Sequence, residues 1–169
     1  ISLLFSILSL SVSAQKPTKA EKAAQLEQEF QQTRQLIESN HFQFELNRVY
    51  PQDGQDLSRF NPRGKFVITD SVAKGTLPFF GRAYSLPYGE GGGIEFDGVM
   101  KDQSLKIEHK KKRKILIYRF SITAKNDTYQ ISMEISGGGN CSVNLNSNNR
   151  AQISYSGTVS PVKDETGKS

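Results

Sequence analysis

The chain has 169 residues, of which 22 are Lys or Arg and 17 are Asp or Glu, so its formal net charge at pH 7 is +5. This length favours one domain over two. The charge favours solubility and weak attraction to anionic surfaces, and does not indicate a nucleic-acid partner. Cys141 is the single cysteine, which excludes an internal disulfide framework; its place in an alternating segment predicts a buried thiol.

The first segment of the chain is typical of a signal peptide. Residues Ile1 to Val12 are apolar and uncharged, and the small-residue pattern that signal peptidase reads ends at Ala14. The segment is short for a transmembrane helix and is interrupted by serines. The sequence therefore predicts export to the periplasm or the extracellular space, cleavage after Ala14, and a mature chain from Gln15 without a transmembrane segment. Because no Met or basic region precedes Ile1, the first few residues of the signal are expected to be missing.

A helix is predicted from Thr18 to about Ser39. Thr18 and Glu21 form a capping box, in which each side chain accepts a hydrogen bond from a backbone N–H group at the helix start. Asn40 is a plausible stop, since Asn tolerates the left-handed backbone conformation. The apolar stripe that should pack against the rest of the protein consists of Ala23, Leu26, Phe30, Thr33 and Ile37.

From His41 onward the hydrophobic period changes to two, which is typical of strands with one buried face. About nine strands are expected, joined mostly by short turns rich in Gly, Asn and Ser. They lie near residues 42–46, 66–70, 72–77, 94–97, 105–109, 116–122, 129–135, 141–145 and 153–155.

These strands predict a mainly β fold. An antiparallel meander of this size must close, so a small barrel similar to lipocalins is favoured, with a two-sheet sandwich as the alternative. The one N-terminal helix would cover a mouth of the barrel or pack outside it. We expect a single domain over residues 15–160, followed by a flexible tail over residues 161–169.

The connection between Thr76 and Gly98 is rich in Gly, Pro and aromatic residues. Alternation places Phe79 in the core and Phe80 on the opposite face. The aromatic rings could form a lid over a small apolar or amphipathic ligand, or they could plug the barrel end. The residues expected to contact a ligand are Phe80, Arg82, Tyr84 and Tyr88.

A basic turn is expected at the tip of a later hairpin. Its residues are Lys110, Lys111, Lys112 and Arg113. It could simply be solvated, or it could bind phosphate or sulfate groups on an anionic surface. Nucleic acid is disfavoured, because no aromatic side chains are interleaved with the basic ones.

No catalytic constellation is present. His41 and His109 lack the spacing of metal ligands, and Glu95 and Asp97 on one polar strand face are typical of a solvated surface. The chain is therefore expected not to be an enzyme, and no catalytic residue, metal or cofactor is predicted.

Three stretches carry a family resemblance: "LPFFGRAYSLPYGEGGGIEFDG", "KKKRKILIYRFSITAKNDTYQISMEI" and "SVNLNSNNRAQISYSG". With them, the chain resembles a family of exported bacteroidete proteins catalogued as domain of unknown function 4251. The resemblance implies an extracytoplasmic location in a Gram-negative bacterium and transfers no catalytic residue. Two hypotheses remain: a binding module that holds a small apolar ligand in its barrel, and a structural or protein-interaction module of the cell envelope.

Overall fold

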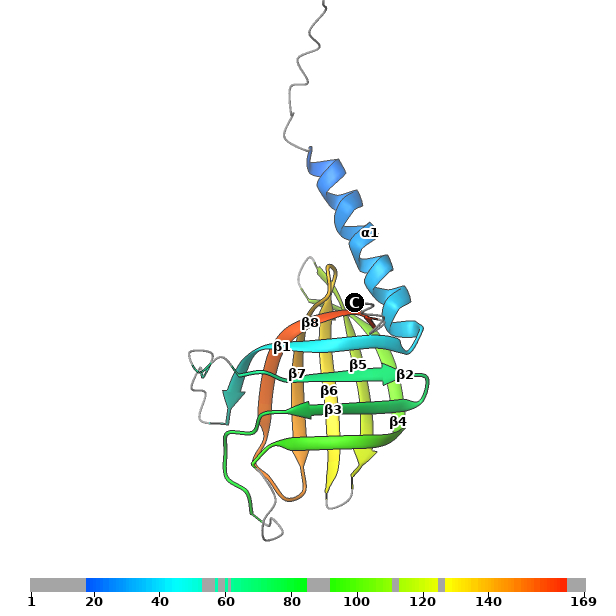
Figure 1. Ribbon diagram of the computed structural model, residues 1–169. Helices are drawn as coiled ribbons and strands as arrows, with labels where there is room; N and C mark the ends of the chain where they lie inside the picture. The colour runs from blue at the N-terminus through cyan, green and yellow to red at the C-terminus, as the bar shows by residue number, and fades with distance from the viewer. Residues whose placement is uncertain are drawn as a thin grey trace, which may run out of the picture.

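The computed structural model describes residues 18–52, 57, 60, 62–84, 92–110, 113–124 and 127–163. Within these residues the chain forms one α-helix followed by a closed antiparallel barrel of eight strands (Figure 1). The strands are β1 (His41–Pro51), β2 (Lys65–Thr69), β3 (Val72–Leu77), β4 (Ile94–Lys110), β5 (Arg113–Thr123), β6 (Thr128–Ser136), β7 (Asn140–Ser147) and β8 (Ile153–Pro161). The prediction of a mainly β fold with a barrel and one N-terminal helix is confirmed.

Each strand pairs with its neighbour in the chain, and β1 closes the barrel by pairing with β8. Figure 1 shows β1 to β3 running across the front, with β5 to β8 behind them at a steep angle. Where β1 and β8 pair to close the barrel, their backbones approach each other closely. A Cβ atom at Gly157 would overlap the carbonyl oxygen of Glu45, next to the register shift between Leu46 and Arg48. Glycine therefore permits the close approach of these two strands.

The number of expected strands was one too high. The segments near residues 94–97 and 105–109 belong to one strand, β4, which passes through an irregularity between Lys101 and Ser104. Asp102 has φ of +53° there, a conformation that inserts an extra residue without ending the strand. The polar run at this bulge interrupts the alternation, and this is why the sequence suggested two strands.

Helix α1 (Lys19–Glu38) begins at the predicted capping box. The Glu21 N–H group donates to Thr18 Oγ1 at 3.2 Å, and the Thr18 N–H group donates to Glu21 Oε2 at 2.6 Å. The chain leaves the helix through Asn40, whose φ of +48° confirms the predicted stop.

Only the second half of the predicted helix stripe is buried. Phe30, Thr33 and Ile37 are buried, whereas Ala23 is exposed and Leu26 is 63% exposed. At the β6–β7 turn, a Cβ atom on Gly137 would lie 3.2 Å from the backbone nitrogen of Phe30. The C-terminal half of α1 therefore lies against one end of the barrel, and its N-terminal half projects beyond it (Figure 1).

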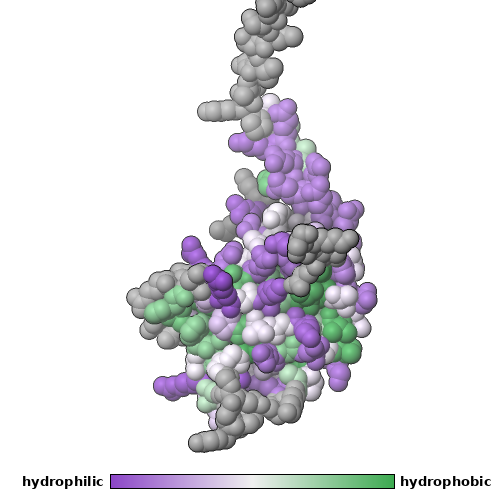
Figure 2. Space-filling view, in the orientation of Figure 1, coloured by the Kyte–Doolittle hydropathy of each residue, from purple (hydrophilic) through white to green (hydrophobic). Residues whose placement is uncertain are grey.

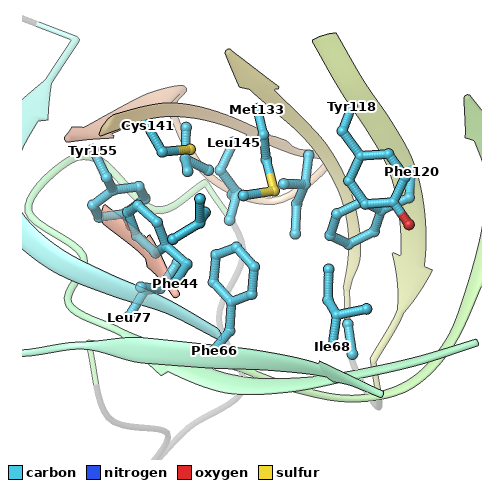
Figure 3. Close-up of a cluster of buried hydrophobic side chains, with 14 of the residues drawn as sticks. Phe44, Phe66, Ile68, Leu77, Tyr118, Phe120, Met133, Cys141, Leu145 and Tyr155 are labelled. Carbon is cyan, nitrogen blue, oxygen red and sulfur yellow. The ribbon is translucent and has the colours of Figure 1, made fainter. Parts of the chain in front are cut away.

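The barrel interior is a packed core. Alternate residues of every strand point inward, and Figure 3 shows side chains from opposite strands directed toward one another. The rings of Phe44 and Phe66 stack with centroids 5.1 Å apart, and Phe96 lies 5.8 Å from Phe66. Cys141 is 4% exposed and belongs to this core, as predicted, and its burial raises the pKa of the thiol.

Candidate functional site

The interior offers no space for a ligand beside its central side chains. A side chain with no accessible surface has no water-sized space next to it. The core residues with an exposed fraction of 0% come from all eight strands, and they are Phe42, Phe44, Val49, Phe66, Ile68, Ala73, Leu77, Ile94, Leu116, Ile122, Met133, Ile135, Val143, Leu145 and Tyr155. A binding site is therefore expected on the outside of the barrel.

The first part of the aromatic connection is docked onto the barrel end opposite the helix. The Tyr84 N–H group donates to the Asn149 carbonyl at 2.7 Å, and the Ala151 N–H group donates to the Arg82 carbonyl at 2.9 Å. Beneath them, the Tyr155 hydroxyl donates to the Pro78 carbonyl at 2.9 Å. These bonds fix the backbone of residues 78–84, which we call the mouth segment.

The side chains of the mouth segment divide as the sequence predicted for Phe79 and Phe80. Phe79 packs against the core, whereas Phe80 is 39% exposed. Arg82 is exposed, and Tyr84 is 68% exposed. The plug interpretation is therefore wrong for Tyr84, since little of its ring is covered. Tyr88 lies outside the described residues, and the ligand role of all four residues stays a prediction.

A buried ion pair lies beneath the mouth segment. Arg150 and Asp127 have side chains 5% and 6% exposed, and Arg150 Nε lies 3.9 Å from Asp127 Oδ2. The Arg150 guanidinium also lies over the ring of Phe79, 5.2 Å from its centroid, and Nη1 donates to the Gly92 carbonyl at 3.4 Å.

Asp127 is held by its own turn and by the end of β7. It accepts hydrogen bonds from the Thr128 N–H group at 2.8 Å and from Ser147 Oγ at 2.5 Å. The pair thus ties two turns and both ends of the aromatic connection together. Sequence reasoning missed it, because Asp127 and Arg150 lie in separate turns and no short motif links them.

The basic turn is partly neutralised by acidic neighbours. Lys110 Nζ lies 2.7 Å from Glu134 Oε2, and Arg113 is exposed. Lys114 Nζ donates to both carboxylate oxygens of Glu27 in α1 at 2.9 Å, and this bond lowers the pKa of Glu27. Lys111 and Lys112 lie outside the described residues. The anionic-surface role of the turn is untested by these contacts and stays a prediction.

A groove of about 1210 Å³ lies over the outer face of β1 to β4. Outward-facing side chains form cross-strand rows there. In the first row Glu45 is opposite Lys65, Lys65 is opposite Thr76, and Thr76 is opposite Glu95. We call this surface the β1–β4 groove; its lining residues are Glu45, Leu46, Arg63, Gly64, Lys65, Val67, Lys74, Gly75, Thr76, Glu95, Phe96, Asp97 and Ala124.

The second row of the β1–β4 groove places Val67 opposite Lys74 and Lys74 opposite Asp97. Lys74 Nζ lies 2.7 Å from Asp97 Oδ2, and this hydrogen bond raises the pKa of Lys74. The outer face of β1 to β4 points toward the viewer in Figure 2, where hydrophilic side chains lie among paler and more hydrophobic ones. Glu95 and Asp97 are therefore part of a mixed-charge surface whose extent sequence reasoning missed, because it depends on the register of four strands.

The described residues provide no obvious metal centre and no membrane-crossing helix. Among them, no group of three or more His, Cys, Asp and Glu side chains is placed to hold a metal ion. In the same part of the chain, no helix combines the length and the apolar character that crossing a membrane requires.

The fold and the groove define a protein built on a closed eight-stranded antiparallel barrel, with a packed interior and an external groove lined by both charged and apolar residues. Residues 24–159 match the family model described as "Domain of unknown function (DUF4251)", so the chain belongs to the DUF4251 family. It is similar to the crystal structure of a DUF4251 family protein from Bacteroides eggerthii DSM 20697, with 22% identity and a TM-score of 0.57. That match covers 82% of this chain and 91% of the other, and it supports the shared fold. No curated protein matches the sequence.

Proposed function

We propose that this protein is a non-enzymatic interaction module of the cell envelope, exported from the cytoplasm, which binds a protein partner in the β1–β4 groove. The packed interior carries the proposal. A lipocalin-type ligand would have to displace side chains that have no accessible surface, including Phe44 and Phe66, and refilling or opening such a core costs several kcal/mol. Binding on the outside requires no such rearrangement.

The charges of the groove suggest the chemistry of the partner. The groove carries charges of both signs: Lys65 lies between Glu45 and Thr76 in the first row, and Lys74 lies opposite Asp97 in the second. Such a surface complements a polypeptide segment that carries both signs of charge, because opposite charges across an interface favour the correct register. A uniformly charged polymer would be repelled by the groove side chains of its own sign.

Export is supported by the first residues of the chain, where the segment from Ile1 to Ala14 has the pattern of a signal peptide. Fractionation of the native host is the test. We expect the protein in the periplasmic or extracellular fraction, with Gln15 at its N-terminus. Recovery in the cytoplasm with Ile1 retained would contradict this part of the proposal.

Site-specific photocrosslinking tests the groove. A photoreactive residue replaces Thr76 within the groove, and the matched control replaces Gln130, which is exposed on β6. In native cells, we expect a crosslinked protein partner from position 76 and none from position 130. The variant Lys74→Glu should reduce the crosslink. Equal crosslinking from both positions would contradict the proposal.

A second candidate function is favoured by the exposed aromatic rings of the mouth segment. Phe80 and Tyr84 are exposed on either side of Arg82, an arrangement that could hold an amphipathic ligand with an acidic head group. Such a ligand would lie against the outside of the barrel end. Extraction and mass spectrometry of protein purified from its host distinguish the two candidate functions. A small molecule that is lost in the variant Tyr84→Ala supports ligand binding at the mouth segment. A co-purifying protein supports binding in the β1–β4 groove.

A further inference from the structure

Within the part of the chain that the structure describes, the second half of β4 has an open edge. β3 pairs with β4 only as far as Val99, and the last hydrogen bond on that side runs from the Met100 N–H group to the Ser71 carbonyl at 2.7 Å. Beyond the bulge, residues 104–110 pair with β5 alone among the described residues. In this stretch Ser104 and Leu105 are half-buried, and residues 106–110 are exposed.

The ladder determines which backbone groups face the open edge. The Ala124 N–H group donates to the Asp127 carbonyl at 2.9 Å, so alternate residues of β5, counted from Ala124, direct their backbone groups toward β6. The intervening residues, such as Ile117 and Ile115, bond to β4, where their partners are Lys106 and Glu108. It follows that the backbone groups of Leu105, Ile107 and His109 point away from β5, toward the open edge.

We propose that this edge, residues 104–110 of β4, pairs with the same edge of a second copy of the chain in antiparallel orientation, on a two-fold axis at Ile107. With this axis, Ile107 lies opposite its own copy as a hydrogen-bonded pair, and Leu105 lies opposite His109 of the second copy. The N–H and carbonyl groups that face the edge then all bond across the axis. The two sheets join into one through a self-complementary interface.

Charge selects this register over its neighbours. An axis at Ile107 places Lys106 opposite Glu108 of the second copy, twice, in pairs whose side chains approach closely. Moving the axis by one residue places Lys106 opposite Lys106, or Glu108 opposite Glu108, which is unfavourable. The Ile107 side chain, 40% exposed in the single chain, meets its copy at the centre of the interface.

The alternative for this edge is protection against pairing. Natural proteins often place lysines and bulges on edge strands to prevent association, and β4 has both. Charged side chains oppose edge pairing where they meet like charges. Here Lys106 and Glu108 have opposite signs at the spacing that makes antiparallel self-pairing attractive, which favours a specific dimer.

Sedimentation velocity of the mature chain over a range of concentrations tests the proposal. We expect a dimer. Lys106→Glu places Glu opposite Glu108 twice, and Glu108→Lys places Lys opposite Lys106 twice, so each variant should weaken dimerisation roughly tenfold or more. The double variant Lys106→Glu with Glu108→Lys restores opposite charges and should restore the dimer. Lys101→Glu, an exposed change before the bulge, is the matched control and should leave the dimer intact.

Amide hydrogen exchange reports on the edge itself. In the wild-type dimer the amides of Leu105, Ile107 and His109 should be protected, and Lys106→Glu should remove this protection while its circular dichroism spectrum stays unchanged. A wild-type chain that remains monomeric overturns the proposal, whether or not another segment of the chain protects these amides. A dimer whose edge amides exchange freely, or one that the double variant fails to restore, overturns it too.

Discussion

The hydroxyl of Tyr118 sits where the barrel meets the end of α1. Its oxygen lies 3.0 Å from Asn40 Oδ1 and 3.0 Å from Gln103 Oε1, and it donates its proton to one of them at a time. The residue is 3% exposed, and burial raises the pKa of Tyr118 to about 12. A single side chain thus joins the helix exit, the bulge of β4 and the centre of β5.

This raised pKa predicts alkaline sensitivity. The folded chain holds the phenol proton more tightly than the unfolded chain, whose tyrosines titrate near pH 10. The stabilisation is therefore complete below about pH 10 and is lost as the pH rises through about 12. In urea unfolding measured against pH, Tyr118→Phe should reduce the alkaline loss of stability.

Burial also raises the pKa of Tyr155. The Tyr118→Phe variant should therefore still lose some stability at alkaline pH. Tyr84→Phe, a change on an exposed ring, is the control and should follow the wild-type profile. A Tyr118→Phe profile that matches the wild type over the whole range would show that the phenol is not a determinant of alkaline stability.

At the scale of elements, α1 divides into a docked half and a projecting half. Phe30 is 4% exposed and Leu26 is 63% exposed, although both lie on the stripe that the sequence predicts to be buried. Phe30→Ala should lower the free energy of unfolding by about 3 kcal/mol, as large-to-small changes in a core do. Leu26→Ala, the matched control on the same helix, should change it by less than about 0.5 kcal/mol. Chemical denaturation measures both, and equal effects would contradict the division.

Helix α1 and strand β4 show which structural features local sequence patterns can predict and which they cannot. Thr18 and Glu21 predict the helix start, because capping depends only on residues within one turn. The exposure of Leu26 depends on where the barrel ends, which no local pattern contains. In β4, alternation fails at the bulge of Asp102, and the strand that continues beyond it was expected as a separate one.

The candidate surfaces were harder to predict than the strands, because they depend on contacts between residues that are distant in the sequence. Alternation shows that Glu95 and Asp97 share a polar face, but only the strand register places Asp97 opposite Lys74 and Glu95 opposite Thr76 in a groove. Arg150 and Asp127 meet because two turns lie side by side at one end of the barrel. Contacts of this kind follow from barrel closure rather than from spacing along the chain.

For the molecule as a whole, we expect residues 163–169 to contribute little to stability. The sequence "KDETGKS" has no apolar side chain to bury. Lys163 does contact Glu45 at 3.2 Å, but both side chains are well exposed, and ion pairs of this kind contribute at most about 1 kcal/mol. Truncation after Val162 should therefore shift the melting temperature by only a few degrees. A larger drop in melting temperature would show that the tail is docked. The variant Lys163→Ala would then measure how much of this drop comes from the ion pair with Glu45.

The pairing of β1 with β8 means that the barrel has no intrinsic first strand. Phe42 at its beginning lies opposite Pro161 at its end, and every other strand pairs with its chain neighbours in the same way. The barrel is thus a ring, and a circular permutant opened at the β2–β3 turn, with the original ends joined by a linker, retains all eight ladders. The docked half of α1 lies at one end of this ring and the mouth segment at the other, so the segments outside the strands distinguish the two ends of the barrel.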